Sequence, residues 1–225
     1  MSKSKFNVVN PDDICDNYGA DTLRLYEMFL GPIEQSKPWN TNGISGVHNF
    51  LNKVWRLFFN DNKLVISESK PDKESLKILH GTIKKINEDI ESFSFNTCVS
   101  ALMILVNKLN ETKCHSRTVL EDLIVLLSPF APHISEELWN VLGHDNSIVD
   151  EEYPVHDPKY LIETEKKYPV SVNGKLKYQI VLPLGISQEE VEKILKNDQS
   201  IIDIINDREI KKIIFVPNKI INIVC

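Results

Sequence analysis

The fold of this chain is decided by the stretch Leu126-Leu127-Ser128-Pro129-Phe130-Ala131-Pro132-His133-Ile134. The residues that lead into it, from Val119 to Leu127, are too uniformly apolar for a surface helix and predict a helix buried in a core. Pro132 suits the first turn of a following helix, where a missing N–H costs nothing. Two helices that meet at a short turn, one of them buried, indicate a helical bundle.

Helical spacing extends this bundle toward the N-terminus. Pro11-Asp12-Asp13 predicts the start of a short helix that ends at Gly19, and Asp21 is expected to cap the next helix. Trp55 and Trp139 fall on apolar stripes, so both are predicted to lie in the core. Apolar residues recur three and four positions apart in three further segments: Val47, Leu51, Val54, Phe58; Leu76, Leu79, Ile83, Ile86, Ile90; and Leu102, Leu105, Leu109.

The pattern changes after residue 150. Tyr168–Val172 and Leu176–Leu182 are strand-like runs joined by Asn173-Gly174, the pair that best tolerates the positive φ values of a type I′ turn. Ser187-Gln188-Glu189-Glu190 is a capping box that opens a helix. Two further strands are expected, at 210–216 and 220–224.

The predicted fold class is therefore mainly α with a small α+β domain, a helical bundle followed by a β-β-α-β-β domain. We expect a loop and connector at 1–20, the bundle at 21–150, a charged linker at 151–167 and the small domain at 168–225. The domain boundary is expected near residue 165.

Composition narrows the class of protein. The net charge of −6 argues against a protein that coats nucleic acid indiscriminately. The charge is uneven, with 12 basic and 19 acidic residues at 61–167 but 8 basic and 7 acidic residues at 168–225. Any contact with RNA is therefore expected to be local.

Cysteine, histidine and hydropathy patterns exclude other classes. Four scattered cysteines without a Cys-x-x-Cys pair favour free thiols in a reducing cytoplasm. No histidine or cysteine spacing is typical of zinc binding, so no metal is expected. No apolar run reaches the roughly 18 residues of a membrane span, and no membrane association is predicted.

The N-terminal segments resemble those of class I aminoacyl-tRNA synthetases. Met1-Ser2-Lys3-Ser4 matches the last four positions of the Lys-Met-Ser-Lys-Ser loop of that family, although Phe6 stands where the family has glycine. Tyr18–Arg24 is similar to the segment that follows the loop. Leu25–Pro32, Glu34–Trp39 and Val54–Leu57 resemble the bacterial leucyl branch of the family, and the stretch at 126–134 is similar to the helical bundle of the same subclass.

This resemblance implies a C-terminal portion of a larger cytoplasmic enzyme that joins leucine to tRNA(Leu) with ATP. The catalytic and editing domains of such an enzyme would lie elsewhere in the protein. Lys3 would be the catalytic residue, because its charge meets the triphosphate as pyrophosphate departs. Met1, Ser2 and Ser4 would complete the ATP loop.

The resemblance also implies contacts with tRNA. In the bundle the candidates are Arg24, Lys53 and Arg56, with pairing of either arginine to an acidic neighbour as the alternative. Lys37 and Trp39 are candidates in the loop before the third helix. In the small domain the candidates are Lys175, Lys177, Lys211 and Lys219, which the pairing of two hairpins is expected to gather near one edge of the sheet.

Two other functions stay open. The chain would also fit a free-standing tRNA-binding or RNA-binding module that uses the same fold. It would equally fit the smaller subunit of a synthetase split between two chains.

Overall fold

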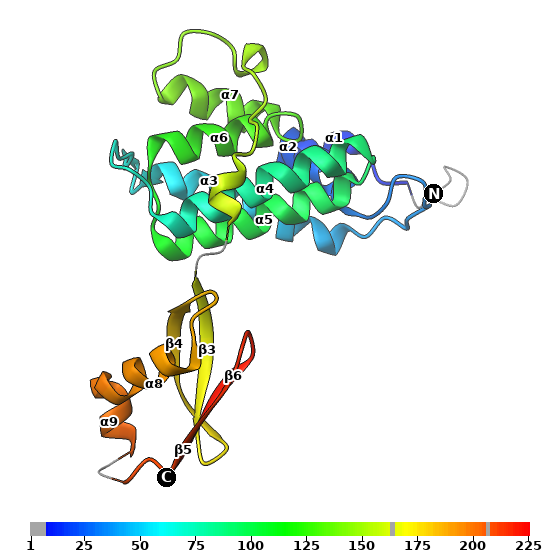
Figure 1. Cartoon of the computed structure of the whole chain (residues 1–225). Coiled ribbons are helices and arrows are strands. Elements are labelled where there is room, and N and C mark those ends of the chain that lie inside the picture. Colours follow the sequence, from blue (N-terminus) through cyan, green and yellow to red (C-terminus); the bar gives the residue numbers. More distant parts are fainter. Residues whose placement is uncertain (1–7, 163–164, 206–207) are drawn as a thin grey trace. The chain divides into compact units, whose positions relative to one another are not determined.

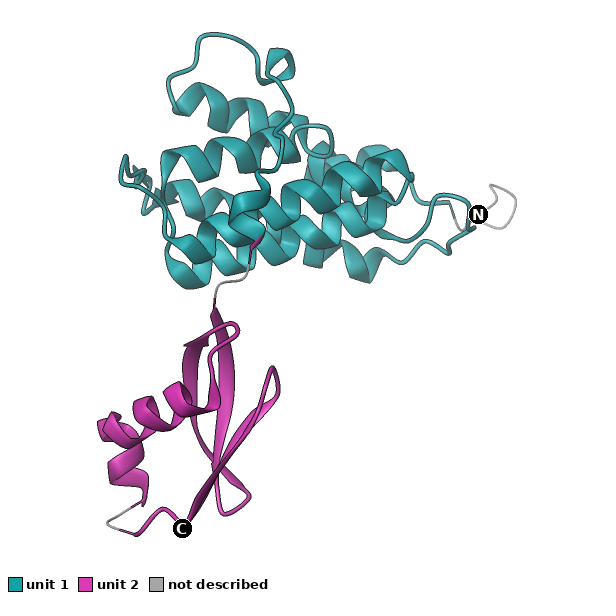
Figure 2. Ribbon diagram, in the orientation of Figure 1, with its two compact units in different colours: residues 1–161 teal, residues 162–225 magenta. Residues whose placement is uncertain are grey.

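The protein divides into two compact units in the computed structural model, residues 1–161 and residues 162–225 (Figure 2). The structure describes residues 8–162, 165–205 and 208–225. The ATP loop expected at Met1–Ser4, with its catalytic Lys3, lies outside the described residues. Each unit has its own hydrophobic core.

The first unit is a helical bundle (Figure 1). Its core is formed mainly by α3, α5 and α6, and the apolar series that spacing assigned to these helices are buried. Its elements are α1 (Pro11–Tyr18), α2 (Ala20–Phe29), η2 (Thr41–Gly43), α3 (Ile44–Phe58), β1 (Phe59–Asn60), β2 (Lys63–Leu64), α4 (Lys73–Glu91), α5 (Phe95–Thr112), α6 (Arg117–Leu127), α7 (Pro132–Val141), η3 (Ile148–Asp150) and η4 (Pro158–Leu161).

Asp21 caps a helix other than its own, and its predicted role is wrong in this respect. The N-cap of α2 is Gly19, which makes no side-chain capping bond. Asp21 is 8% exposed and accepts the backbone N–H groups of His133 at 3.3 Å and Ile134 at 2.8 Å. These are orphan donors of the first turn of α7. One buried carboxylate therefore joins the second helix to the seventh.

The segment 151–161, which we call the strap, packs on the bundle. The Tyr153 hydroxyl donates to the Leu126 carbonyl at 3.1 Å. The backbone N–H of Asp157 donates to Nδ1 of His80 on α4 at 3.2 Å, and the His80 ring stacks on Tyr160 with centroids 4.4 Å apart. The linker was predicted to run from 151 to 167. Most of it instead belongs to the first unit, because these polar and aromatic contacts hold it there.

The second unit is a four-stranded sheet with two helices. It contains β3 (Glu165–Val172), β4 (Lys175–Pro183), α8 (Gln188–Asn197), α9 (Gln199–Ile205), β5 (Lys212–Val216) and β6 (Ile220–Val224). The strand order is β4-β3-β6-β5, in which β3 and β6 are parallel and the other pairs are antiparallel. The two hairpins therefore join through their inner strands.

Local signals explain most of this unit. Asn173 and Gly174 turn with φ of 51° and 79°, and the capping box of Ser187 and Glu190 is formed. The helix α9 was not predicted. Asp198 opens it by accepting the backbone N–H of Ser200 at 2.9 Å. The unit therefore has two helices between its hairpins where one was expected.

Candidate nucleic-acid interface

Arg24 is occupied by a structural contact. Its Nη2 donates to the carbonyl oxygen of Pro129 at 2.9 Å, across 105 positions of sequence. That oxygen lies in the turn between α6 and α7, shortly before the N-terminus of α7 that Asp21 caps. Arg24 and Asp21 thus hold the same turn from one helix, and Arg24 pairs with a carbonyl, not with the acidic neighbour considered as its alternative.

Trp39 is held inside its own loop. Its Nε1 donates to Thr41 Oγ1 at 2.9 Å, and its ring meets Tyr26 edge-on with centroids 5.2 Å apart. The Trp39 side chain packs partly against the bundle core. Lys37 is exposed and donates through Nζ to Gln35 Oε1 at 2.8 Å. Of the two loop candidates, Lys37 is exposed and Trp39 is half-buried.

Helix α3 presents a surface that favours an anion. It contains Lys53 and Arg56 and no aspartate or glutamate from Ile44 to Phe58, although the chain as a whole is acidic. Lys53 Nζ donates to Asn107 Oδ1 at 2.7 Å. Arg56 is exposed and has no hydrogen bond or ion pair with the part of the chain that the structure describes.

Trp55 lies beside Arg56 and is not a core residue, contrary to the prediction. It is 36% exposed, whereas Trp139 is 4% exposed as predicted. The indole of Trp55 stacks on the ring of Phe59 with centroids 4.6 Å apart and planes 17° apart. Helical spacing failed here because Trp55 follows Val54 at the border of the apolar stripe, where 100° of rotation separates a buried position from an open one.

The lysines of the second unit do not gather at one edge, so that expectation is wrong. Lys175 and Lys177 lie on β4, whereas Lys211 directly precedes β5. These strands are the two outer edges of the sheet, because the inner strands β3 and β6 pair with each other. Three strand spacings separate them, roughly 14 Å. Lys219 lies in the turn between β5 and β6, and all four side chains are exposed.

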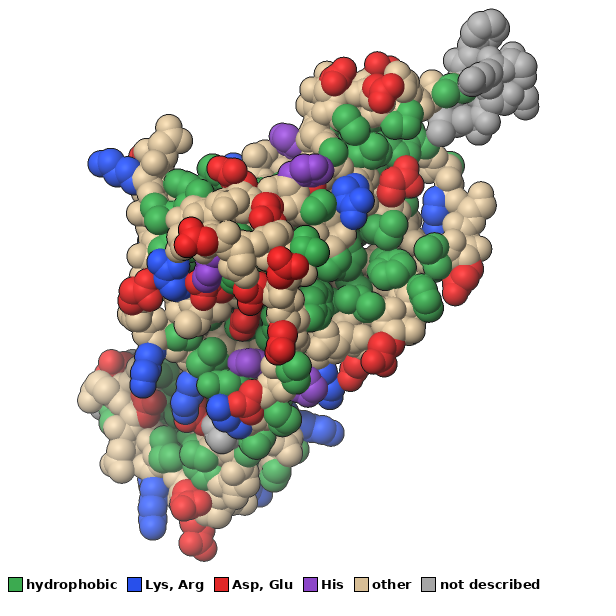
Figure 3. Space-filling view, turned by 90° about the horizontal axis from the view of Figure 1, so that it is seen from above, with side chains coloured by type: hydrophobic (Ala, Val, Ile, Leu, Met, Phe, Trp, Pro, Cys, Tyr) green, Lys and Arg blue, Asp and Glu red, His purple; other side chains and the backbone are tan. Residues whose placement is uncertain are grey.

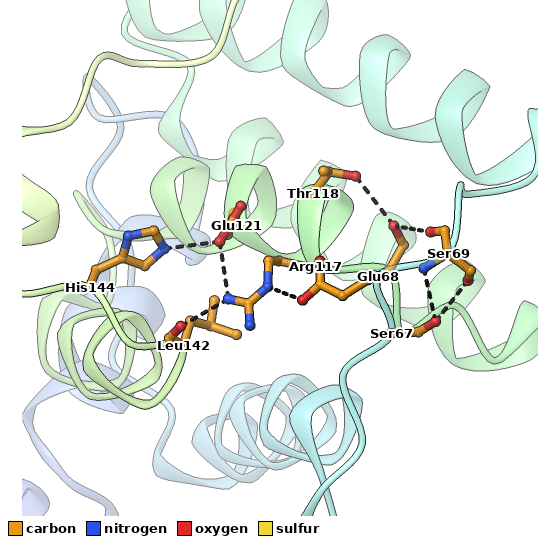
Figure 4. Close-up of polar contacts among 9 residues, drawn as sticks. Ser67, Glu68, Ser69, Arg117, Thr118, Glu121, Leu142 and His144 are labelled. Atoms are coloured by element: carbon orange, nitrogen blue, oxygen red, sulfur yellow. Dashed lines mark hydrogen bonds and ion pairs between the residues drawn. The ribbon is translucent and has the colours of Figure 1, made fainter.

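A separate polar cluster has a structural role (Figure 4). Arg117 Nε donates to Glu68 Oε1 at 2.6 Å, and its Nη1 donates to the Leu142 carbonyl at 2.9 Å. Glu121 Oε1 lies 3.5 Å from Arg117 Nη1 and 2.9 Å from His144 Nε2. The guanidinium therefore braces three segments. Among the described residues, no three His, Cys, Asp or Glu side chains are placed to hold a metal ion.

Charges of both signs are mixed on the surface. On the face seen in Figure 3, blue lysines and arginines and red aspartates and glutamates are interspersed. None of the helices in the described part of the chain has the length and apolarity required to cross a membrane. The arrangement fits local contacts with a polyanion at separate points.

Comparison with known proteins identifies the family. The family described as the anticodon-binding domain of tRNA ligase matches residues 72–195, more than half of the chain. The chain belongs to this family.

Named relatives define the likeness further. Leucine--tRNA ligase of Flavobacterium psychrophilum is 58% identical over 224 residues, which are 100% of this chain and 23% of that protein. Leucine--tRNA ligase of Cytophaga hutchinsonii is 54% identical over 225 residues, 100% of this chain and 24% of that protein. The chain thus spans about a quarter of the length of these relatives.

A solved structure has the same fold. The ternary complex of Agrobacterium radiobacter K84 LeuRS, tRNA and LeuAMS matches with a TM-score of 0.65 and 29% identity, over 100% of this chain and 31% of that chain.

Proposed function

We propose that this chain is the tRNA-binding C-terminal portion of a leucyl-tRNA synthetase of the cytoplasm. The full-length enzyme would ligate leucine to tRNA(Leu), with ATP converted to AMP and pyrophosphate. The observation that carries the proposal is identity of 58% along the whole chain to a leucine--tRNA ligase of which it covers 23%. The likeness to a LeuRS bound to tRNA supports tRNA as the partner.

The catalytic part of the proposal rests on Lys3. As a mobile cation beside the triphosphate, with Met1, Ser2 and Ser4 around it, Lys3 would stabilise the departing pyrophosphate in the full-length enzyme. We expect Lys3→Ala in that enzyme to slow leucine activation by about 10²–10³-fold, with a smaller effect on leucine affinity. Leucine-dependent pyrophosphate exchange measures this rate. Unchanged activation kinetics would remove Lys3 from the reaction.

Binding of tRNA by the chain itself is assigned to separate points. Arg56, Lys53 and Lys37 supply exposed cations on the first unit. Arg24 contributes to tRNA binding chiefly by holding the turn between α6 and α7, and Trp39 by holding its own loop. Lys175 and Lys177 form one contact of the second unit, and Lys211 with Lys219 form others.

Titration of a tRNA(Leu) transcript with the purified chain tests this proposal. If three or four lysines or arginines contact phosphates, the logarithm of the affinity falls against the logarithm of salt concentration with a slope of roughly −2 to −4. No binding above that of a protein of equal charge would exclude a tRNA-binding role. A free-standing RNA module would bind unrelated tRNAs equally well, and a split subunit would form a stable complex with a separate catalytic chain.

The chain alone is expected to make no leucyl-adenylate. One loop cannot position ATP and leucine, and such positioning accounts for several kcal/mol of the barrier. Pyrophosphate exchange by the purified chain above a buffer control would contradict this expectation.

A further inference from the structure

We propose that Trp55 forms a stacking platform for an unpaired base of the bound RNA, with Arg56 as the cation for the adjoining phosphate. The inference rests on the proposed tRNA-binding function and adds a named contact to it. We call the surface made by Asn52, Trp55, Arg56 and Phe59 the Trp55 face. Asn52, Trp55 and Arg56 are spaced i, i+3 and i+4 on α3 and therefore lie on one side of the helix, and Phe59, which follows the helix and begins β1, stacks on Trp55.

The geometry of the indole is preorganised for stacking. Phe59 lies nearly parallel to Trp55, with an angle of 17° and centroids 4.6 Å apart. That contact covers one face of the indole and fixes its orientation before any ligand arrives. Trp55 is 36% exposed, so part of a ring that Phe59 holds in one orientation stays open to an aromatic partner. Bases of any identity stack on such a surface.

Apolar area continues beyond the indole. Phe59 pairs with Leu64 across the β1–β2 hairpin, and Leu64 is 45% exposed. A single exposed aromatic needs no special explanation, but an ordered aromatic pair that adjoins an exposed leucine is a surface suited to a flat apolar partner.

The charges around Trp55 favour binding of a polyanion. Arg56 is the neighbouring cation and is engaged by no described residue. Two further lysines are near in sequence: Lys53 is two positions before Trp55, and Lys63 begins β2 of the hairpin. The nearest acid in sequence is Asp61 in the hairpin turn. An aromatic ring with adjacent cations, on a helix without acids, matches the base and phosphate of one nucleotide.

Stacking and charge predict different salt behaviour, and this difference provides the test. The purified chain is titrated with a tRNA(Leu) transcript at several salt concentrations. Trp55→Ala is expected to weaken binding about ten-fold at every salt concentration and to leave the salt slope unchanged, because stacking releases no counterion. Arg56→Gln is expected to flatten the slope by about one unit.

Matched variants separate stacking from folding. Trp55→Phe keeps an aromatic ring and is expected to retain most of the affinity, while the part of the RNA-induced change in tryptophan fluorescence that comes from Trp55 is lost. Phe93→Ala removes an aromatic residue that is 62% exposed and lies two positions after Glu91, and it is expected to bind as the wild type does. Circular dichroism checks that each variant has wild-type helix content.

A comparison of RNAs tests the preference for an unpaired base. The loss caused by Trp55→Ala is expected with an oligouridine probe and absent with a fully paired duplex. Equal affinities of Trp55→Ala and wild type for tRNA and oligouridine would overturn the inference and assign the indole to contact with another part of the enzyme. The same outcome leaves the proposed function standing if the wild-type chain binds tRNA. No tRNA binding by the wild type would overturn both.

Discussion

The side chain of Asp21 shows how a single residue can determine how two helices meet. Its buried carboxylate serves two donors of the α7 N-terminus and lies 2.8 Å from His133 Nδ1. Asp21→Ala is expected to lower the free energy of unfolding by about 1–3 kcal/mol, because it removes the acceptor of two part-buried N–H groups in the first turn of α7. Urea unfolding of the whole chain measures this loss. Asp13→Ala, an exposed first-turn acid on α1, is the control, and an equal effect of both changes would contradict the capping role.

The partly buried carboxyl group of Asp122 lowers the free energy of unfolding at neutral pH. Burial raises the pKa of its carboxyl to about 6, and the adjacent Glu121 adds to the rise. The folded state therefore holds a proton more tightly than the unfolded chain, whose aspartate pKa is 3.8. Stability is lost as pH rises through this window and is lowest above pH 6. Asp122→Asn is expected to raise the free energy of unfolding at pH 7 by about 3 kcal/mol. No gain at pH 7, or a gain that persists at pH 4, would contradict this account.

At the scale of elements, the strap depends on a neutral histidine. Burial lowers the pKa of His80, whose Nδ1 accepts the N–H of Asp157. Asp157 opposes the shift, whereas Lys159 and His156 reinforce it. The contact is complete above the unfolded pKa of 6.5 and weakens as pH falls below it, since protonation removes the acceptor.

Hydrogen exchange of the strap is therefore expected to accelerate as the pH falls below 6.5, after correction for the intrinsic rate. His80→Phe keeps a ring for Tyr160 but cannot titrate. Its strap is expected to exchange faster than the wild type at neutral pH and to show no such pH step. A strap that exchanges identically in both proteins would assign its docking to Tyr153 and its other contacts.

The elements that sequence predicted best are those that local patterns determine. The Asn173-Gly174 turn and the capping box at Ser187 formed because each depends on a few adjacent residues. The donor that Asp21 accepts, the backbone N–H of His133, could not be predicted because it lies 112 positions away in the sequence. The separation of the lysines was missed for the same reason: strand order depends on which hairpin strands pair. Only the neighbouring cations Lys53 and Arg56 indicate in the sequence that Trp55 is exposed, and this indication is weak.

At the scale of the whole molecule, the sheet topology predicts that basic contacts act independently. Lys175 and Lys177 are on one edge of the second unit and Lys211 is near the other. The combined change of Lys175→Ala and Lys177→Ala is expected to add, in binding free energy, to that of Lys211→Ala, within about 0.5 kcal/mol. Filter binding of tRNA by the single-edge and combined variants measures this. Strong coupling between the edges would instead indicate that one phosphate contact uses both.

The strap also determines how far the second unit can travel. With the strap docked, four peptide steps separate Leu161 from Glu165, and they span at most roughly 14 Å. With the strap released from residue 151, fifteen steps would span roughly 50 Å. The volume open to the second unit would then be tens of times larger, and its effective concentration near an RNA already held by the bundle would fall in proportion. His80 on α4 and Tyr153 and Tyr160 on the strap would thus set the length of free chain before the second unit, and with it the avidity of tRNA binding by the whole chain.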